Sequence, residues 1–119
     1  MDASEQRIRV YQKKDGKRPF SNWFNKLRDR KAQVRIDARL ARVQLGNFGD
    51  TKAVGEGVLE LRIDYGPGYR VYLGRDGSAV VILLLGGDKR TQSKDIDTAK
   101  KYWADYKARK TEETDGTNN

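Results

Sequence analysis

Two arginines occupy matching positions in neighbouring strand-like segments. Residues 58–64 read VLELRID and residues 69–73 read YRVYL, so Arg62 and Arg70 fall on the polar side of two alternating segments. In an antiparallel pair, these positions bring both guanidinium groups to one face of the sheet. A guanidinium group matches phosphate oxygens in geometry and stays protonated near neutral pH. The pattern favours a phosphate-binding face, although Glu and Arg pairs across strands also occur on sheets that simply face water.

Four other side chains near these arginines have useful chemistry. Glu60 and Tyr72 share the same alternating positions, and Lys89 and Arg90 follow the next apolar run. Tyr72 suits both stacking on a nucleic-acid base and covering the sheet. Lys89 and Arg90 would add two cations at the end of the sheet.

Three more arginines lie on a predicted helix. Arg35, Arg39 and Arg42 follow the spacing i, i+4, i+7, which places them on one helix face. The plainer interpretation is a solvated helix surface. Alternatively, the three cations bind a nucleic-acid backbone without reading its sequence, and such binding weakens steeply with salt.

Composition narrows the chemistry and the class of partner. The 119 residues contain 25 Lys and Arg against 17 Asp and Glu, giving a net charge of +8, and we therefore expect a polyanionic partner such as nucleic acid or an acidic protein. The chain has no Cys and no His, which excludes disulfides, thiolate metal sites and a histidine base. Catalysis would rest on Arg, Lys, Tyr, Asp or Glu, and we expect no metal and no cofactor.

The two ends of the chain suggest a cytoplasmic protein. The segment MDASEQRIRV lacks the apolar centre of a signal peptide, and no segment approaches the roughly 18 apolar residues of a membrane span. The last nine residues, TEETDGTNN, contain three acids and no apolar side chain. We therefore expect one folded domain over residues 1–110 and a disordered acidic tail over residues 111–119.

Hydrophobic periodicity predicts a strand, two helices, three strands and a final helix. Residues 7–13 alternate as a one-sided strand, and the helices are predicted near 19–27, near 31–45 and from about residue 91 onward. Residues 46–57 read as a loop, and an antiparallel meander follows with turns at 66–69 and 75–78. The fold class is α+β, with an antiparallel sheet packed against helices. Periodicity leaves the place of the first strand in the sheet open.

Residues 58–103 carry a more specific pattern. The segments LELRIDYGPGYRVYL and LLLGGDKRTQSKDIDTAKKYW resemble the RelE/ParE superfamily of bacterial toxins from type II toxin–antitoxin modules, in particular its HigB-like addiction module killer proteins. The preceding strand, helix and helix agree with that family in order and length. The resemblance implies a RelE-like toxin domain over residues 1–110. It also implies a cognate antitoxin, expected to be of the helix-turn-helix type, that neutralises the toxin in a hetero-oligomer.

The resemblance also implies an activity. RelE and HigB members cut messenger RNA without a metal, typically at the ribosome, through attack of the RNA 2′-hydroxyl on the adjacent phosphate. On matching positions, Arg70 resembles the family's phosphate-binding arginine, and Arg62 would bind the phosphate or orient Glu60. Lys89 or Arg90 resembles the basic residue after the last strand. The preferred candidate for the general base is Glu60, with Lys52 as its rival. Many relatives have histidine or tyrosine there, whereas this chain has Gly87-Asp88-Lys89, so the acid and the base stay open.

Three other functions remain possible from the sequence. A ParE-like toxin would inhibit DNA gyrase without cutting nucleic acid, because one fold supports different functions. A metal-dependent nuclease would need Glu60, Asp64 and Asp88 to converge on one ion. A non-toxic RNA-binding module would use the same cations without turnover.

Overall fold

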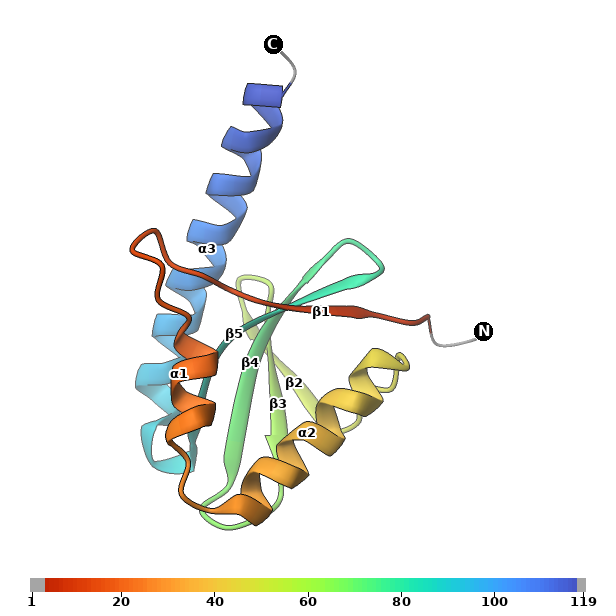
Figure 1. The fold of residues 1–119 in the computed structure, drawn as a ribbon, viewed down its shortest axis with the longest axis vertical. Helices are drawn as coiled ribbons and strands as arrows, with labels where there is room; N and C mark the ends of the chain where they lie inside the picture. The colour runs from red at the N-terminus through yellow and green to blue at the C-terminus, as the bar shows by residue number, and fades with distance from the viewer. Residues whose placement is uncertain (1–3, 118–119) are drawn as a thin grey trace.

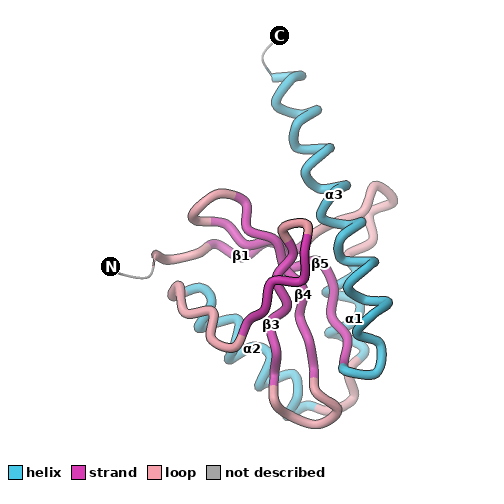
Figure 2. The backbone as a smooth tube through the Cα atoms, turned by 180° about the vertical axis from the view of Figure 1, so that it is seen from behind, coloured by secondary structure: helices cyan, strands magenta, loops and turns pink. Residues whose placement is uncertain are grey.

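The computed structural model describes the backbone of residues 4–117 and the side chains of residues 4–112. It confirms the α+β class: a five-stranded mixed sheet packs against α1 and α2 on one face and α3 on the other (Figures 1 and 2). Along the chain the elements are β1 (Arg7–Val10), α1 (Pro19–Lys26), α2 (Arg30–Gln44), β2 (Thr51–Gly55), β3 (Val58–Ile63), β4 (Tyr69–Asp76), β5 (Val80–Asp88), a short 3-10 helix (Lys89–Thr91) and α3 (Gln92–Thr117).

The sheet differs from the predicted one in two respects. Its order is β1-β5-β4-β3-β2, and β1 pairs with β5 in parallel at one edge, so the sheet is mixed rather than antiparallel. The predicted loop over residues 46–57 contains β2, which pairs antiparallel with β3 at the other edge. Periodicity does not predict this edge strand, because Lys52 and Ala53 are both exposed and its side chains show no apolar alternation. Backbone hydrogen bonds to β3 carry no signal in the sequence.

Local signals set the bounds of the helices. Pro19 occupies the first turn of α1, where its missing N–H is not needed. Asp29 caps α2, its Oδ1 accepting a hydrogen bond from the Ala32 N–H at 3.2 Å. The turn between β3 and β4 lies one residue earlier than predicted, because the Gly68 N–H donates to the Tyr65 carbonyl at 3.1 Å. The loop between β4 and β5 has three residues, 77–79, rather than two.

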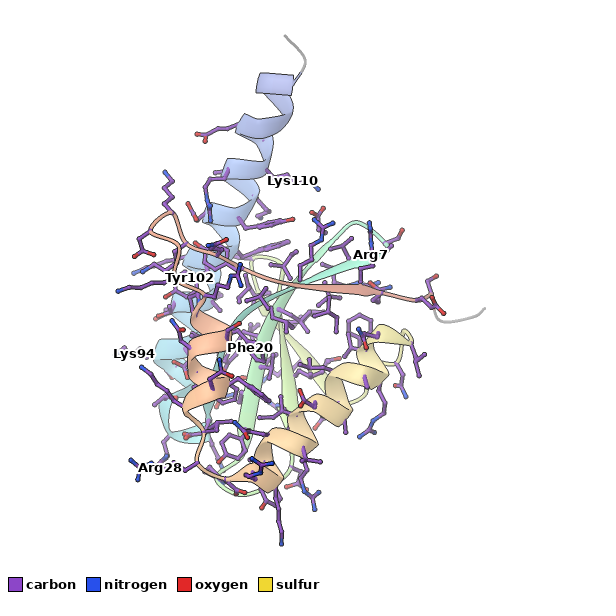
Figure 3. The ribbon with its side chains drawn as sticks, in the orientation of Figure 1. Arg7, Phe20, Arg28, Lys94, Tyr102 and Lys110 are labelled. Carbon is purple, nitrogen blue, oxygen red and sulfur yellow. The ribbon has the colours of Figure 1, made fainter. Side chains whose placement is uncertain are left out.

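Each face of the sheet carries its own core. Phe20, Ile36 and Val43 pack from α1 and α2 onto one face, and Ala99 and Trp103 of α3 pack onto the other. Figure 3 shows Phe20 between α1 and the sheet, whereas Arg28 and Lys94 project away from the body.

Two glycines bring the flanking layers close to the central strands. A Cβ on Gly86 of β5 would lie 2.0 Å from the Trp23 ring, and one on Gly74 of β4 would lie 2.5 Å from the Trp103 ring. Only glycine fits at such contacts, so both indole rings rest directly on backbone.

The C-terminal half of α3 extends past the end of the sheet (Figure 1). The sequence predicts a disordered tail from residue 111, whereas the structure continues the helix to Thr117; residues 118–119 lie outside the described residues. Extending an existing helix adds about one backbone hydrogen bond per residue, and Glu112 and Glu113 are good helix formers. Within residues 4–117, no helix has the length and apolar character needed to cross a membrane.

Arg39 has a structural position rather than the exposed one that its spacing predicts. Its side chain is 9% exposed, and its guanidinium group donates to the backbone carbonyls of Phe48 at 2.9 Å, Asp50 at 3.3 Å and Arg62. Burial, and then the positive charge of Arg42, lower the pKa of Arg39. Arg39 therefore ties α2 to β3 and to the loop between α2 and β2. Its hydrogen bonds to three backbone carbonyls favour a structural role, and its predicted contact with a nucleic-acid backbone stays a prediction.

We expect Arg39→Ala to lower the free energy of unfolding by on the order of 3 kcal/mol, because three backbone carbonyls lose a charged donor that is itself almost fully buried. Arg42→Ala is the matched control: Arg42 is an exposed arginine three residues along α2, and its loss should change stability by less than about 0.5 kcal/mol. Urea unfolding followed by circular dichroism measures both. Equal stability of the two variants would contradict the structural role of Arg39.

Candidate functional site

Three of the predicted catalytic cations line one cavity. Arg62 of β3, Arg70 of β4 and Lys89 of the 3-10 helix surround a space of about 380 Å³ at the end of the β3–β4 hairpin; we call it the arginine cavity. The turn at residues 66–68 forms another wall, and Asp50, Ile63 and Asp64 line the rest of the cavity. The structure therefore brings together side chains from three separate elements, as their strand positions predict for the two arginines.

The strand register forces the two arginines into contact with one carboxylate. Arg62 lies directly opposite Arg70 in the β3–β4 ladder, an arrangement in which like charges destabilise a sheet. Glu60 relieves this repulsion. Its Oε1 accepts a hydrogen bond from Arg62 Nε at 3.0 Å and lies 3.8 Å from Arg70 Nε.

Glu60 is completely buried, and its second oxygen is also satisfied. Oε2 accepts hydrogen bonds from the Tyr72 hydroxyl at 3.1 Å and from Gln92 Nε2 at 2.8 Å. Burial by itself raises the pKa of Glu60, but the hydrogen bonds from Gln92, Arg62 and Tyr72 and the charge of Arg70 outweigh it, so its pKa lies below the ordinary value. A carboxylate that is both inaccessible and weakly basic is a poor general base. These contacts favour a positioning role for Glu60 over its predicted role as general base.

Arg70 is held more tightly than Arg62. Its side chain is 12% exposed against 35% for Arg62, and its Nη1 donates to the Gly68 carbonyl at 2.9 Å. Its Nε is buried with no hydrogen bond, so its contact with Glu60 is electrostatic. Because the guanidinium group is fixed at the cavity wall in advance, little side-chain entropy would be lost when it binds an anion.

Lys89 and Arg90 follow β5 but separate in space. Lys89 is exposed and lines the arginine cavity. Arg90 does not line it, and its Nη2 forms an ion pair of 2.9 Å with Asp88. That hydrogen bond holds the pKa of Asp88 below its usual range. Only Lys89 of this pair faces the two strand arginines.

Two other predicted site residues lie away from the cavity. Lys52 is exposed on edge strand β2, opposite Glu60 in the ladder, but it does not line the arginine cavity. Tyr72 is 0% exposed, and burial together with Glu60 raises the pKa of its hydroxyl. Its ring cannot stack on a nucleic-acid base in this structure. Of the two roles that the sequence allowed, Tyr72 covers the sheet and holds Glu60.

A second hollow adjoins the arginine cavity along α2. It has a volume of about 430 Å³, and Arg35, Arg39 and Arg42 line it. It shares Asp50, Ile63 and Asp64 with the arginine cavity. Arg35 and Arg42 are exposed, and the Arg35 guanidinium lies 4.5 Å from the centre of the Tyr65 ring. The three predicted helix cations therefore line one hollow beside β3, with Arg35 and Arg42 exposed and Arg39 bound to backbone carbonyls.

Sequence reasoning missed Gln92 as part of the site. Gln92 is the first residue of α3 and donates to Glu60 from the α3 layer. A signal was present: Gln92 precedes Ile96, Ala99 and Trp103 by four, seven and eleven residues, and so lies on the buried stripe of that helix. A polar side chain on an apolar stripe indicates a buried polar partner.

The two acids proposed beside Glu60 as metal ligands do not join it. Asp88 is paired with Arg90, and Asp64 is exposed at the cavity rim. Among the side chains that the structure describes, no group of three acidic, cysteine or histidine residues gathers as a set of metal ligands.

We expect Glu60→Gln to destabilise the fold by on the order of 3 kcal/mol near neutral pH, because two arginines then lose their buried counter-charge. The effect should depend on pH. Glu60 has a lowered pKa in the folded protein, so the unfolded chain binds its proton first, near the ordinary value of about 4.3, and stability falls as pH drops from there through the folded pKa.

Unfolding measured from pH 7 down to pH 3 for both proteins tests this sign. The difference between wild type and Glu60→Gln should shrink as the medium becomes acidic. A difference that stays constant over this range would show that the Glu60 charge does not stabilise the fold.

Comparison with known proteins places this arrangement in a family. Residues 22–104 match the family model described as "Phage derived protein Gp49-like (DUF891)". A relative from Haemophilus influenzae, described as an uncharacterized protein, is 56% identical over 81 residues, which cover 68% of this chain and 82% of the relative. The matched segment contains α2, the β2–β5 meander and the start of α3, and so includes every residue of the arginine cavity. The chain belongs to the Gp49-like family of phage-derived proteins, a family associated with toxin–antitoxin modules.

Proposed function

We propose that this protein is the toxin of a toxin–antitoxin pair and that it cuts RNA without a metal ion. The convergence of Arg62, Arg70 and Lys89 on one cavity carries this proposal. Three cations from separate elements, with the two arginines held by a buried carboxylate, form a preorganised positive site. Such a site stabilises charge that develops on a phosphate during reaction. Membership of a family associated with toxin–antitoxin modules supports the same assignment.

The proposed reaction is an internal transfer within the RNA chain. The 2′-oxygen forms a bond to the adjacent phosphorus, the bond from phosphorus to the 5′-oxygen breaks, and the products are a 2′,3′-cyclic phosphate and a 5′-hydroxyl. Arg70 and Arg62 would bind the phosphate oxygens, and Lys89 would donate a proton to the leaving 5′-oxygen. Asp50 and Asp64 are the carboxylates that line the cavity. They therefore replace Glu60 as candidates to accept the 2′-proton.

Exposed cations around the cavity fit a long polyanionic substrate. Arg35 and Arg42 line the adjoining hollow, and Lys52 and Arg90 are exposed on β2 and on the 3-10 helix. We propose that these four residues contact RNA backbone, with messenger RNA on the ribosome as the substrate. Neutralising several phosphates makes binding strongly dependent on salt.

We expect Arg70→Ala to reduce RNA cleavage by about 10² or more, the scale of removing one preorganised charge stabiliser. Arg75→Ala is the matched control, because Arg75 is an exposed arginine on the same strand and does not line the cavity. Cleavage of a defined messenger RNA, with and without ribosomes, gives the rates, and mapped 5′ ends give the chemistry. Cleavage by wild type should persist in EDTA.

Three results would contradict the proposal. Full activity of Arg70→Ala would remove the arginine from the reaction, and loss of cleavage in EDTA would indicate a metal-dependent nuclease. Growth arrest with DNA damage and intact transcripts would instead favour a ParE-like inhibitor of DNA gyrase, the alternative that shares this fold.

A further inference from the structure

The outer face of α2 exposes an apolar stripe that the domain itself does not use. Among residues whose exposure the structure describes, Val34 and Leu45 are the exposed large hydrophobic side chains, at 67% and 65%. Ala38 and Ala41 lie between them and are also exposed. Leu45 directly follows the last residue of α2, as its C-cap. We call these four residues the α2 seam. Their spacing of four, three and four residues is that of one contact line between packed helices.

The α2 seam points away from the core. Ile36 and Val43, which are fully buried, face the sheet from the opposite side of the same helix. At a rise of about 1.5 Å per residue, the seam is about 16 Å long. The two alanines at its centre permit close approach of another backbone, and Val34 and Leu45 provide larger contacts at its ends. This shape suits a helix of about three turns.

The charges beside the α2 seam determine what kind of helix it fits. Lys31, Arg35 and Arg42 lie along one flank at helical spacing, and all three are exposed. The other flank carries Asp37 and, one turn before Val34, the exposed Arg30, so cations outnumber acids beside the seam. A partner helix with acidic residues on one side would therefore complement α2. A second copy of α2 would place cation against cation, and an RNA backbone would leave Val34 and Leu45 without apolar contacts.

A helix on the α2 seam would also lie near the candidate active site. Arg35 and Arg42 belong both to the flank of the seam and to the hollow that shares three wall residues with the arginine cavity. Acidic side chains paired with these arginines would stand at the rim of that hollow. They would repel a polyanionic substrate there without touching Arg62 or Arg70.

We propose that the α2 seam is the docking site for an acidic amphipathic helix of the antitoxin. This inference rests on the proposed toxin function, since it assigns a surface to the partner that such a toxin requires. The docked helix blocks RNA by occupying the cations beside the cavity, and the cavity itself keeps its conformation.

The test compares two identical substitutions on different helices. Ala41→Asp puts a charge in the α2 seam, and Ala108→Asp puts the same charge on an exposed position of α3. The partner is the protein encoded by the neighbouring reading frame, titrated by isothermal calorimetry against each full-length variant. Uncomplexed variants are assayed for RNA cleavage, and circular dichroism checks that they are folded. Val34→Asp, at the other end of the seam, repeats the test if Ala41→Asp is unfolded.

We expect Ala41→Asp to weaken partner binding by at least about tenfold, because a buried charge is left unpaired, while Ala108→Asp binds as wild type does. Both variants should cleave RNA at the wild-type rate. Equal partner affinity in all three proteins, or no binding by wild type, would overturn the inference.

Two other outcomes would also overturn it by assigning the surface to a different ligand. A seam variant that loses RNA affinity but keeps the partner would make the seam an RNA surface. Loss of a wild-type dimer in sedimentation would make it a contact between copies. In every case cleavage by the uncomplexed protein decides the proposed function separately.

Discussion

The contact of Glu60 with two opposing arginines is the interaction on which this site depends. Arg62 and Arg70 are directly opposite each other in the β3–β4 ladder. Like charges on neighbouring strands repel strongly where the dielectric constant is low. A fully buried carboxylate between them makes the arrangement possible. That carboxylate must in turn be compensated, since burying a charge is costly without donors. Tyr72 and Gln92 supply those donors from the neighbouring strand and from α3.

The three-layer architecture explains why this network lies at the end of the hairpin. Along most of β4 both faces are covered, and the residues from Val71 to Gly74 are buried. The covering layer on one face begins at Gln92, where α3 starts beside the strand ends. Glu60 therefore lies beneath the first turn of α3, whereas Arg62, two residues further along β3, remains partly exposed. The buried residues of the network, Glu60 and Tyr72, stabilise the fold. Arg62, at its outer end, remains accessible to an anion.

Particular residues show what the sequence predicts well and where it fails. Alternation places Arg62 and Arg70 on one face because the two-residue period of a strand depends only on its backbone. The same alternation counts Glu60 as a solvent-facing residue, because a single strand carries no information about the helix that covers its second face. Arg39 fails in the same way: its spacing matches Arg35 and Arg42, but it is drawn inward by carbonyls from a loop and from β3. Strand β2 is hidden because a single apolar side chain, Val54, packs on the core, and one such residue produces no alternation in the sequence.

The positive surface beside the cavity has consequences for regulation. RNA phosphates and an acidic helix would be attracted by the same exposed cations, Arg35 and Arg42, so they would exclude each other even if their contacts differed elsewhere. RNA and an acidic helix would be bound by different kinds of interaction. Phosphate contacts weaken steeply with salt, whereas burial of Val34 and Leu45 does not depend on counter-ion release. A helix that combines the two kinds of contact would therefore keep its hold on the α2 seam at salt concentrations that dissociate RNA. For the toxin that we propose, an exposed apolar seam beside a basic surface would thus separate binding of a protein inhibitor from binding of RNA.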